Sequence, residues 1–336
     1  MMKSSAIAHS NIALIKYWGR SRRHNPALNI PLNDTVSMTK LGLNEGIQLK
    51  THTTIEFSPD YESDSILVGD ELISGRHQER IVHLVDLLRQ QARINDRFHM
   101  ESRNDFPTQA GLASSASAFA ALTLAAAAAL GLKLSKRELS QYARLGSGSA
   151  ARSIHGGFVY CYAGSSHETA YAEQICPEDC FDMNAVIALV DDSKKVITSD
   201  EGHYLASTSP FNDLRIQYSQ QQALETRRLI LENNFEAVGQ IAETNCLYMH
   251  TVMMTSQPAL FYWQPTTLRI IKTIQKIREQ GLRCYFTIDA GPNVHCLCRS
   301  QNMTELQRIV ESIEGVKRTI LVKPAPDAYL TDDHLF

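Results

Sequence analysis

Two charged residues lie in short runs that combine small, aromatic and turn-forming residues, as reactive sites often do. Asp289 belongs to residues 285–293 (YFTIDAGPN), where an apolar run ends just before Gly291 and Pro292. A carboxylate held at the end of a buried strand can orient a hydroxyl group or accept its proton. The alternative is a turn aspartate that caps its own backbone.

Lys16 belongs to residues 11–19 (NIALIKYWG), which begin at Asn11 and continue from the lysine into Tyr17 and Trp18. Core packing explains the apolar residues of this run, but it does not require a lysine, a tyrosine and a tryptophan in succession. An ammonium group can stabilise developing negative charge or lower the pKa of a neighbouring acid.

A third charged residue, Arg152, lies in residues 146–153 (GSGSAARS) with Ser147, Gly148 and Ser149. An arginine can bind a carboxylate or a phosphate through two parallel hydrogen bonds, and serine hydroxyls can complete such an anion site. The alternative is a solvent loop with a surface arginine.

Residues 107–117 (PTQAGLASSAS) open an uncharged, alanine-rich helix that is expected to end near Leu130. Small residues let a ligand approach the backbone, and a helix start offers unpaired N–H groups and partial positive charge to a phosphate. The run lacks the lysine of the GxxxxGK[ST] nucleotide loop. Its expected phosphate-binding residues are Pro107, Ala110, Gly111, Leu112, Ala113, Ser114, Ser115 and Ser117, with Ser115 also a candidate metal ligand.

A membrane-spanning helix is the alternative interpretation of residues 110–130. Alanine and serine dominate this stretch, and they insert into a bilayer poorly compared with leucine, isoleucine or phenylalanine. We therefore expect a buried helix that offers its N-terminus to an anion.

The elements around these runs predict an α+β fold of two lobes, residues 1–183 and 184–336. In the first lobe, helices are expected at residues 78–94 and from the capping box at Ser135 to about Leu145. In the second lobe, strands at 185–191, 283–289, 294–298 and 318–322 alternate with helices at 213–232, 235–253, 266–280 and 304–311. This order is typical of a ferredoxin-like lobe.

The composition limits the kinds of partner that the protein is expected to bind. A net charge of −3 and 21% charged residues give no reason to expect nucleic acid or an anionic membrane. Arg20, Arg22, Arg23 and His24 form one short basic cluster, for which a local anion-binding role is favoured over a solvated loop. Seven cysteines without framework spacing suggest incidental thiols in a reducing compartment, and the N-terminus lacks a sustained apolar run, so a cytoplasmic protein is expected.

The runs NIALIKYWG, PTQAGLASSAS, GSGSAARS and DAGPN, taken in order, resemble the signatures of the diphosphomevalonate decarboxylases. These enzymes belong to the superfamily of galactokinase, homoserine kinase, mevalonate kinase and phosphomevalonate kinase. The resemblance covers most of the chain. It implies a ribosomal-protein-S5-domain-2-like N-terminal lobe, a ferredoxin-like C-terminal lobe and a cleft between them. It also implies a homodimer.

The resemblance further implies ATP- and Mg²⁺-dependent conversion of mevalonate 5-diphosphate to isopentenyl diphosphate, carbon dioxide, ADP and phosphate. Asp289 would orient or deprotonate the 3-hydroxyl group, Lys16 would tune the charge, and Arg152 would hold the substrate carboxylate. The other residues expected to contact the substrate are Asn11, Tyr17, Trp18, Arg20, Ser147, Gly148, Ser149 and Ser199.

The sequence departs from the family pattern at three places. Arg20 replaces a lysine after KYWG, and Ala151 replaces a cysteine in the GSGS loop. Asp200 lies where an arginine that helps to bind substrate phosphates is expected. The last change leaves open a substrate with less phosphate, such as mevalonate 5-phosphate or mevalonate, and a 3-kinase that does not decarboxylate. A silent nucleotide-binding sensor is disfavoured, because the charged residues of all three motifs are present.

Overall fold

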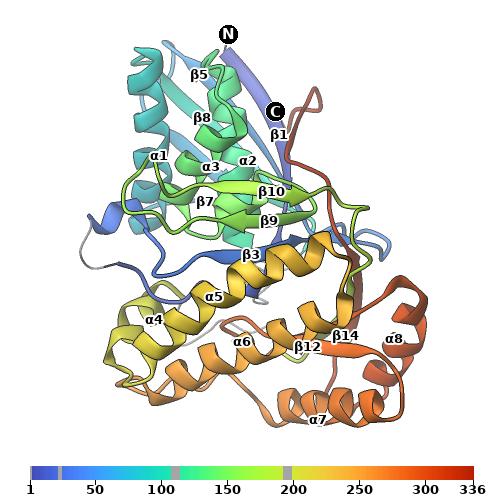
Figure 1. The fold of residues 1–336 in the computed structure, drawn as a ribbon. Helices are drawn as coiled ribbons and strands as arrows, with labels where there is room; N and C mark the ends of the chain where they lie inside the picture. The colour runs from blue at the N-terminus through green and yellow to red at the C-terminus, as the bar shows by residue number, and fades with distance from the viewer. Residues whose placement is uncertain (1, 22–24, 107–113, 192–198) are drawn as a thin grey trace.

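The computed structural model describes residues 2–21, 25–106, 114–191 and 199–336. Its strands form sheets of six, four and five strands. Figure 1 shows the six- and four-stranded sheets in one half of the molecule and the five-stranded sheet, with helices α4 to α8, in the other half. The expected two-lobed α+β fold is confirmed.

The six-stranded sheet and three helices form the first lobe. In spatial order the strands are β15 (Tyr329–Thr331), β1 (Met2–His9), β5 (Lys50–Ser58), β8 (Arg97–Asn104), β6 (Ser65–Val68) and β7 (Glu71–Leu72). The helices are α1 (Arg76–Ala92), α2 (Ser114–Ala129) and α3 (Lys136–Gly146). Because α2 is built mainly from alanine and carries no charge, it can lie directly on β1 and β5 with most of its side chains buried.

The four-stranded sheet lies between this lobe and the second one. Its strands, in order, are β10 (Ala172–Cys176), β9 (Phe158–Cys161), β3 (Thr35–Thr39) and β2 (Asn11–Ile15). One face of it joins an apolar core that also includes residues of the five-stranded sheet, such as Ile187 and Ile320. This shared core fixes the end of β2, and therefore Lys16, against the second lobe.

The second lobe has the strand order β12 (Cys284–Thr287), β13 (Val294–Cys298), β11 (Asn184–Leu189), β14 (Arg318–Lys323) and β4 (Leu41–Gly42), all antiparallel. Its helices are α4 (Ser199–Leu205), α5 (Asn212–Leu231), α6 (Phe235–Thr255), α7 (Pro265–Glu279) and α8 (Met303–Glu311). Along β11, alternate residues enter different cores: Ile187 packs toward the first lobe and Val186 toward α7 and α8. Both faces are covered, which explains the continuous apolar run.

Two strands cross between the lobes. β4 follows β3 of the first lobe but pairs with β14, and β15 follows the second lobe but pairs with β1. The chain therefore returns to the first lobe at its end (Figure 1). The division at residue 183 stays a prediction.

Sequence periodicity predicted α1 and α5 to α8 to within a few residues. It missed β10, β15, α4 and the short 3₁₀ helix η2 (Ala150–Ser153), which contains Arg152. These elements are short, and each depends on contacts with distant residues, so local pattern carries little information about them.

The capping box that opens α3 is confirmed. Ser135 Oγ accepts a hydrogen bond from Glu138 N, and Glu138 Oε2 accepts one from Ser135 N at 2.8 Å. We expect Ser135→Ala to lower the free energy of unfolding by about 1 kcal/mol, because Glu138 N loses its acceptor and the Glu138 carboxylate loses the hydrogen bond that it accepts from the Ser135 hydroxyl. Urea unfolding of the variant beside Ser135→Asp, which keeps a capping oxygen, measures this. Equal losses in both variants would contradict the assignment.

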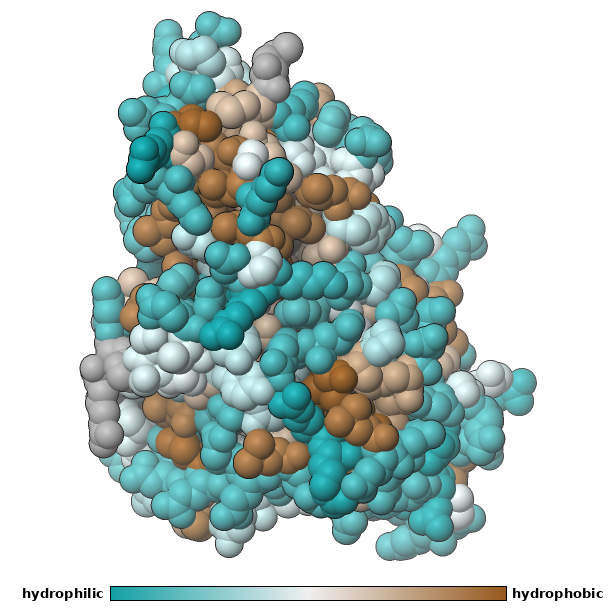
Figure 2. All heavy atoms as spheres, turned by 45° about the horizontal axis from the view of Figure 1, so that its top comes forward, coloured by the Kyte–Doolittle hydropathy of each residue, from teal (hydrophilic) through white to brown (hydrophobic). Residues whose placement is uncertain are grey.

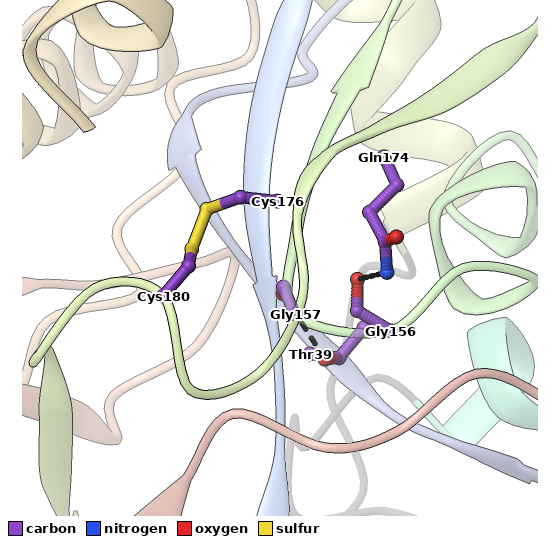
Figure 3. Close-up of a disulfide and its surroundings, with 6 residues drawn as sticks. All are labelled: Thr39, Gly156, Gly157, Gln174, Cys176 and Cys180. Atoms are coloured by element: carbon purple, nitrogen blue, oxygen red, sulfur yellow. Dashed lines mark hydrogen bonds between the residues drawn. A yellow bond between two sulfur atoms is a disulfide. The ribbon is translucent and has the colours of Figure 1, made fainter. Parts of the chain in front are cut away.

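A disulfide joins Cys176, at the end of β10, to Cys180 in the connection to β11 (Figure 3). The Cα atoms lie 6.0 Å apart because Cys180 N donates to Pro177 O in a tight turn. The expectation of incidental thiols is therefore wrong for this pair. It holds for Cys161, Cys246, Cys284, Cys296 and Cys298, which are free and buried.

On the face shown in Figure 2, hydrophilic residues cover much of the surface and hydrophobic residues gather in several separate patches. Within the described residues, no helix combines the length and apolar character needed to cross a membrane. The expected homodimer stays a prediction.

Candidate active site

Lys16 follows β2 directly, and both lobes fix its backbone. Lys16 N donates to Asn245 Oδ1 of α6 at 2.8 Å, and Lys16 O accepts from Asn33 Nδ2 at 3.2 Å. Asn245 is itself held by Ser219 and Gln222 of α5. The segment is therefore clamped between α6 and the approach to β3.

The Lys16 ammonium joins the two sequence motifs that were expected to meet. Its Nζ donates to Ala13 O at 2.8 Å and to Asp289 Oδ1 at 2.7 Å. The Lys16 side chain is 1% exposed, whereas that of Asp289, two residues beyond β12, is 34% exposed. The structure thus places a buried cation behind a carboxylate that a ligand can reach.

Asp289 is ionised at neutral pH. Burial alone would raise the pKa of its carboxyl group, but the charge and hydrogen bond of Lys16, with smaller contributions from His295 and Lys40, lower that pKa to about 2. A carboxylate of this kind accepts a hydrogen bond strongly and takes up a proton weakly.

We expect Lys16→Met to raise the pKa of Asp289 above its ordinary value of 3.8, because burial would then be largely unopposed. The pKa can be measured from the carboxyl ¹³C shift of aspartate-labelled protein. The resonance is assigned by its loss in the Lys16→Met/Asp289→Asn double variant. A carboxyl group that still titrated near pH 2 would show that Lys16 is not its main partner.

Arg152 is also held at this junction. It is 4% exposed, its Nε donates to Asn11 Oδ1 at 3.3 Å, and one terminal nitrogen donates to Thr35 Oγ1 at 3.2 Å. Asn11 Nδ2 in turn donates to Ser149 O and to Ser153 Oγ. Asn11 thereby ties the start of β2 to the GSGS loop.

No carboxylate among the described residues forms a salt bridge with Arg152, although Asp289 contributes a favourable charge interaction. Burial lowers the pKa of the guanidinium group, which reflects the cost of keeping this charge away from water. Its two protein acceptors use only part of its five N–H donors. A buried guanidinium that keeps several N–H donors without a protein acceptor is suited to bind an anionic ligand.

The Tyr17 ring lies between the GSGS loop and α4. A Cβ atom at Gly148 would come within 2.3 Å of Tyr17 Oη, so only glycine permits this approach. On another side, the His203 ring centroid lies 4.4 Å from that of Tyr17, and Arg20 Nε donates to Tyr17 Oη at 3.1 Å. Tyr17, Gly148 and Arg20 therefore lie together, and their expected contact with the substrate stays a prediction.

Serine hydroxyls connect the GSGS loop to the start of α2. Ser147 Oγ lies 3.2 Å from Ser149 Oγ and 3.3 Å from Ser115 Oγ, and Ser115 is exposed. Ser117 differs, because its buried hydroxyl accepts from Thr51 Oγ1 and donates to Ser114 O. The other expected phosphate-loop residues, Pro107, Ala110, Gly111, Leu112 and Ala113, lie outside the described residues, as do Arg22 and Arg23.

Two further residues, Trp18 and Ser199, were expected to contact the substrate. Trp18 is 2% exposed and packs in an apolar cluster with Met249, Met253 and Leu260. Its indole thus supports the motif from within the core. Ser199 is the first residue of α4, but its side chain, like that of Asp200, lies outside the described part of the chain.

Sequence reasoning missed the polar residues that position the motifs. Arg215 of α5 is buried and donates to Asn33 Oδ1 at 2.9 Å and to Trp18 O at 2.8 Å. Its pKa is lowered by burial to about 10. A polar residue on an amphipathic helix normally faces solvent, so nothing local signals that Arg215 or Asn245 faces the site.

The two-lobed fold, the helix start beside a serine-rich loop and the Lys16–Asp289 pair define a member of the galactokinase, homoserine kinase, mevalonate kinase and phosphomevalonate kinase superfamily. Residues 8–172 match the diphosphomevalonate decarboxylase-like N-terminal domain, and residues 185–324 match the mevalonate 5-diphosphate decarboxylase C-terminal domain. The chain belongs to the diphosphomevalonate decarboxylase family.

Three similar proteins illustrate the family. Diphosphomevalonate decarboxylase of Candida albicans is 36% identical over 87% of this chain and 83% of its own length. Phosphomevalonate decarboxylase of Haloferax volcanii is 31% identical over 92% of both. The solved protein MDDEF, in complex with MVAPP, AMPPCP and magnesium, is 34% identical, with a TM-score of 0.88 over 98% of this chain and 99% of that one.

Proposed function

We propose that this enzyme catalyses the ATP-dependent decarboxylation of mevalonate 5-diphosphate to isopentenyl diphosphate, with release of carbon dioxide, ADP and phosphate. One observation carries the proposal: Arg152, a buried guanidinium whose N–H donors are only partly used, lies within electrostatic range of the ionised and partly exposed carboxylate of Asp289. A cation for the substrate carboxylate and an anion for its hydroxyl group are what this reaction requires. The family membership agrees with it.

Arg152 binds the substrate carboxylate through the N–H groups that Asn11 and Thr35 leave free. Asn11 and Thr35 fix the guanidinium plane before the substrate arrives. Such positioning matters, since the carboxylate must be aligned with the C3–O bond that breaks when carbon dioxide leaves.

Asp289 accepts a hydrogen bond from the 3-hydroxyl group and so orients the hydroxyl oxygen, which is the acceptor in the phosphoryl transfer. With a pKa of about 2 it removes little proton density before transfer. Because phosphoryl transfer passes through a loose transition state, orientation is the larger need, and the proton moves to Asp289 late. Lys16 holds the carboxylate in place and offsets its charge near the phosphates.

The residues at the start of α2 fit ATP with Mg²⁺. Three serine hydroxyl groups follow one another in space beside the start of α2, those of Ser149, Ser147 and Ser115. Hydroxyl donors beside a helix start suit the binding of phosphate. No group of three or more histidine, cysteine or acidic side chains suited to a metal occurs among the described residues. That suits Mg²⁺, which is commonly held by phosphates, water and one or two protein oxygens, here with Ser115 as the candidate ligand.

When bound, ATP would supply the γ-phosphoryl group and Mg²⁺ would neutralise its charge. The 3-hydroxyl oxygen gains this group, which makes the oxygen a good leaving group. The oxygen then leaves C3 as phosphate, and the Arg152-bound carboxylate leaves as carbon dioxide. The electron pair that had joined the carboxyl carbon to the substrate becomes the new double bond.

A second candidate, decarboxylation of mevalonate 5-phosphate, is favoured by two observations. The Haloferax volcanii relative is a phosphomevalonate decarboxylase, and Asp200 occupies a position where a phosphate-binding arginine was expected. An acid there would weaken binding of a second phosphate, by about 1 kcal/mol at 4 Å in water.

The test is release of ADP and carbon dioxide from purified protein given ATP, Mg²⁺ and mevalonate, its 5-phosphate or its 5-diphosphate separately. Matched ADP and carbon dioxide from the diphosphate support the first candidate, and preference for the monophosphate supports the second. ADP without carbon dioxide would mean a kinase. Neither product from any substrate would overturn both candidates and favour a nucleotide-binding sensor.

We further propose that the protein is a cytoplasmic homodimer. Size-exclusion chromatography with light scattering tests its assembly.

A further inference from the structure

One buried thiol beside the site has no part in the mechanism above. Cys246 lies on α6, is fully buried and does not belong to the disulfide. Burial raises the pKa of its thiol to about 11, so the group keeps its proton at neutral pH and is not a nucleophile. A free cysteine in such a place is ordinarily a small apolar residue of the core. The contacts of Cys246 indicate a further role.

The Cys246 thiol binds both polar groups of the Ile288 backbone. Its Sγ accepts a hydrogen bond from Ile288 N at 3.2 Å and donates one to Ile288 O at 3.5 Å. A thiol can accept and donate at once only while it is protonated, as this one is. The side chain therefore satisfies one donor and one acceptor of the residue that comes immediately before Asp289.

Ile288 needs this partner because strand pairing ends one residue earlier. The last pair between β12 and β13 joins Thr287 to His295. Ile288 is fully buried, and among the described residues no backbone group pairs with its N–H or C=O. Buried backbone groups without partners are costly, so a strand end of this kind requires a partner from a side chain. The thiol supplies it and extends the ordered part of β12 as far as Asp289.

The residue before Cys246 holds the other half of the Lys16–Asp289 pair. Asn245 Oδ1 accepts from Lys16 N at 2.8 Å. Lys16 follows β2, Asp289 comes two residues after β12, and α6 packs against both strands. Two consecutive residues of one helix therefore fix the backbone on both sides of the ion pair. A helix holds such contacts more precisely than a loop does.

We propose that Cys246 is a positioning residue for the reaction, and that its thiol replaces a strand partner for Ile288 and so aims the Asp289 carboxylate at the hydroxyl group of the substrate. Cys246 touches neither the substrate nor ATP, and it acts through the backbone alone. The kinetic part of the proposal rests on the proposed function, because it needs a reaction in which Asp289 orients a hydroxyl group.

The alternative is that Cys246 only fills space in the core. A second cysteine, Cys296 of β13, provides the comparison, because both residues belong to the same apolar cluster and both are free and fully buried. Among the described residues, none forms a hydrogen bond with the Cys296 thiol, whereas Cys246 has its two bonds to Ile288. Cys296 is therefore a matched control for the loss of a buried thiol.

The first test compares serine at the two positions by thermal unfolding. A hydroxyl group can take over both bonds to Ile288, so Cys246→Ser should change the Tm by less than about 1 °C. Cys296→Ser buries a hydroxyl group that has no partner, and it should lower the Tm by about 2–4 °C. Equal losses in the two variants would show that position 246 does not need a hydrogen-bonding side chain, and the proposal would be overturned.

The second test is kinetic. Cys246→Ala should lower kcat by about 10- to 100-fold and leave the KM values for substrate and ATP within about threefold, since a misplacement of about 1 Å can cost 100-fold in rate. Cys246→Ser should restore most of this loss. Cys296→Ala removes the same atoms from the same cluster and should keep the kcat of the wild type. An unchanged kcat in Cys246→Ala, or an equal loss in Cys296→Ala, would overturn the proposal.

A double-variant cycle with Asp289→Asn shows whether Cys246 acts through Asp289. Because Asp289→Asn already removes the carboxylate, adding Cys246→Ala should lower the single-turnover rate by less than about twofold more. A further loss as large as in the wild-type background would place the effect of Cys246 elsewhere and overturn the proposal.

The position of Asp289 can also be followed without turnover, from its carboxyl ¹³C titration. The pKa of Asp289, about 2 in the wild type, should rise in Cys246→Ala, because the carboxylate is no longer held against Lys16, and it should not rise in Cys246→Ser. The same pKa in all three proteins would overturn the proposal. A wild type that turns over no substrate would instead overturn the proposed function, and this titration would still decide whether Cys246 positions Asp289.

Discussion

Asp289→Asn lowers kcat by about three orders of magnitude while the protein still binds ATP and substrate. The asparagine keeps the shape of the side chain but removes the charge that holds the 3-hydroxyl group and receives its proton, an effect typically of 10²- to 10⁴-fold. Lys16 also loses its anionic partner and so presents an uncompensated cation to the phosphates. Binding of anionic ligands should therefore stay the same or strengthen.

Single-turnover measurements at saturating ATP separate this effect from binding, which calorimetry measures with the non-hydrolysable analogue AMPPCP. Asp327→Asn is the matched control. Asp327 also pairs with a lysine, Lys136, and its side chain is 36% exposed, close to the 34% of Asp289. Loss of activity in both variants would point to general damage, and a small loss in Asp289→Asn would remove this residue from the reaction.

The charged residues of the site could be predicted because each lies in a run whose composition folding does not explain. Lys16 and Asp289 were assigned to a common site from separate motifs, and the structure joins them at 2.7 Å. Of the expected phosphate-loop residues, the structure describes Ser114, Ser115 and Ser117, and of these Ser115 lies beside Ser147. The roles of these residues stay predictions until they are tested.

The supporting residues could not be predicted, since their function depends on contacts between distant parts of the chain. Asn245 is 229 residues from the Lys16 backbone that it fixes. Lys40 looks like an ordinary polar residue at the end of a strand, and only the crossing of β4 to the second lobe buries it. The disulfide was missed for a similar reason, because a tight turn after β10 decides whether Cys176 and Cys180 meet.

Arg152→Gln should raise the KM for the substrate at least about 100-fold, with less than about a threefold change in the KM for ATP. A charge-assisted hydrogen bond contributes about 1.5–3 kcal/mol, and two such bonds to one carboxylate would be lost together. The free enzyme should not lose stability, because the change removes a buried cation that has no salt-bridge partner among the described residues.

Arg152→Lys distinguishes charge from geometry at this position. A lysine restores the positive charge but not the planar pair of donors, so the KM for the substrate should lie between those of the wild type and Arg152→Gln. Arg137→Gln, at an exposed arginine on α3, is the control for a general change in net charge. If Arg152→Gln raised the KM for ATP as much as that for the substrate, Arg152 would belong to the nucleotide site. If it lowered only the Tm, the guanidinium would be a structural link between Asn11 and Thr35, and the carboxylate of the substrate would need another partner.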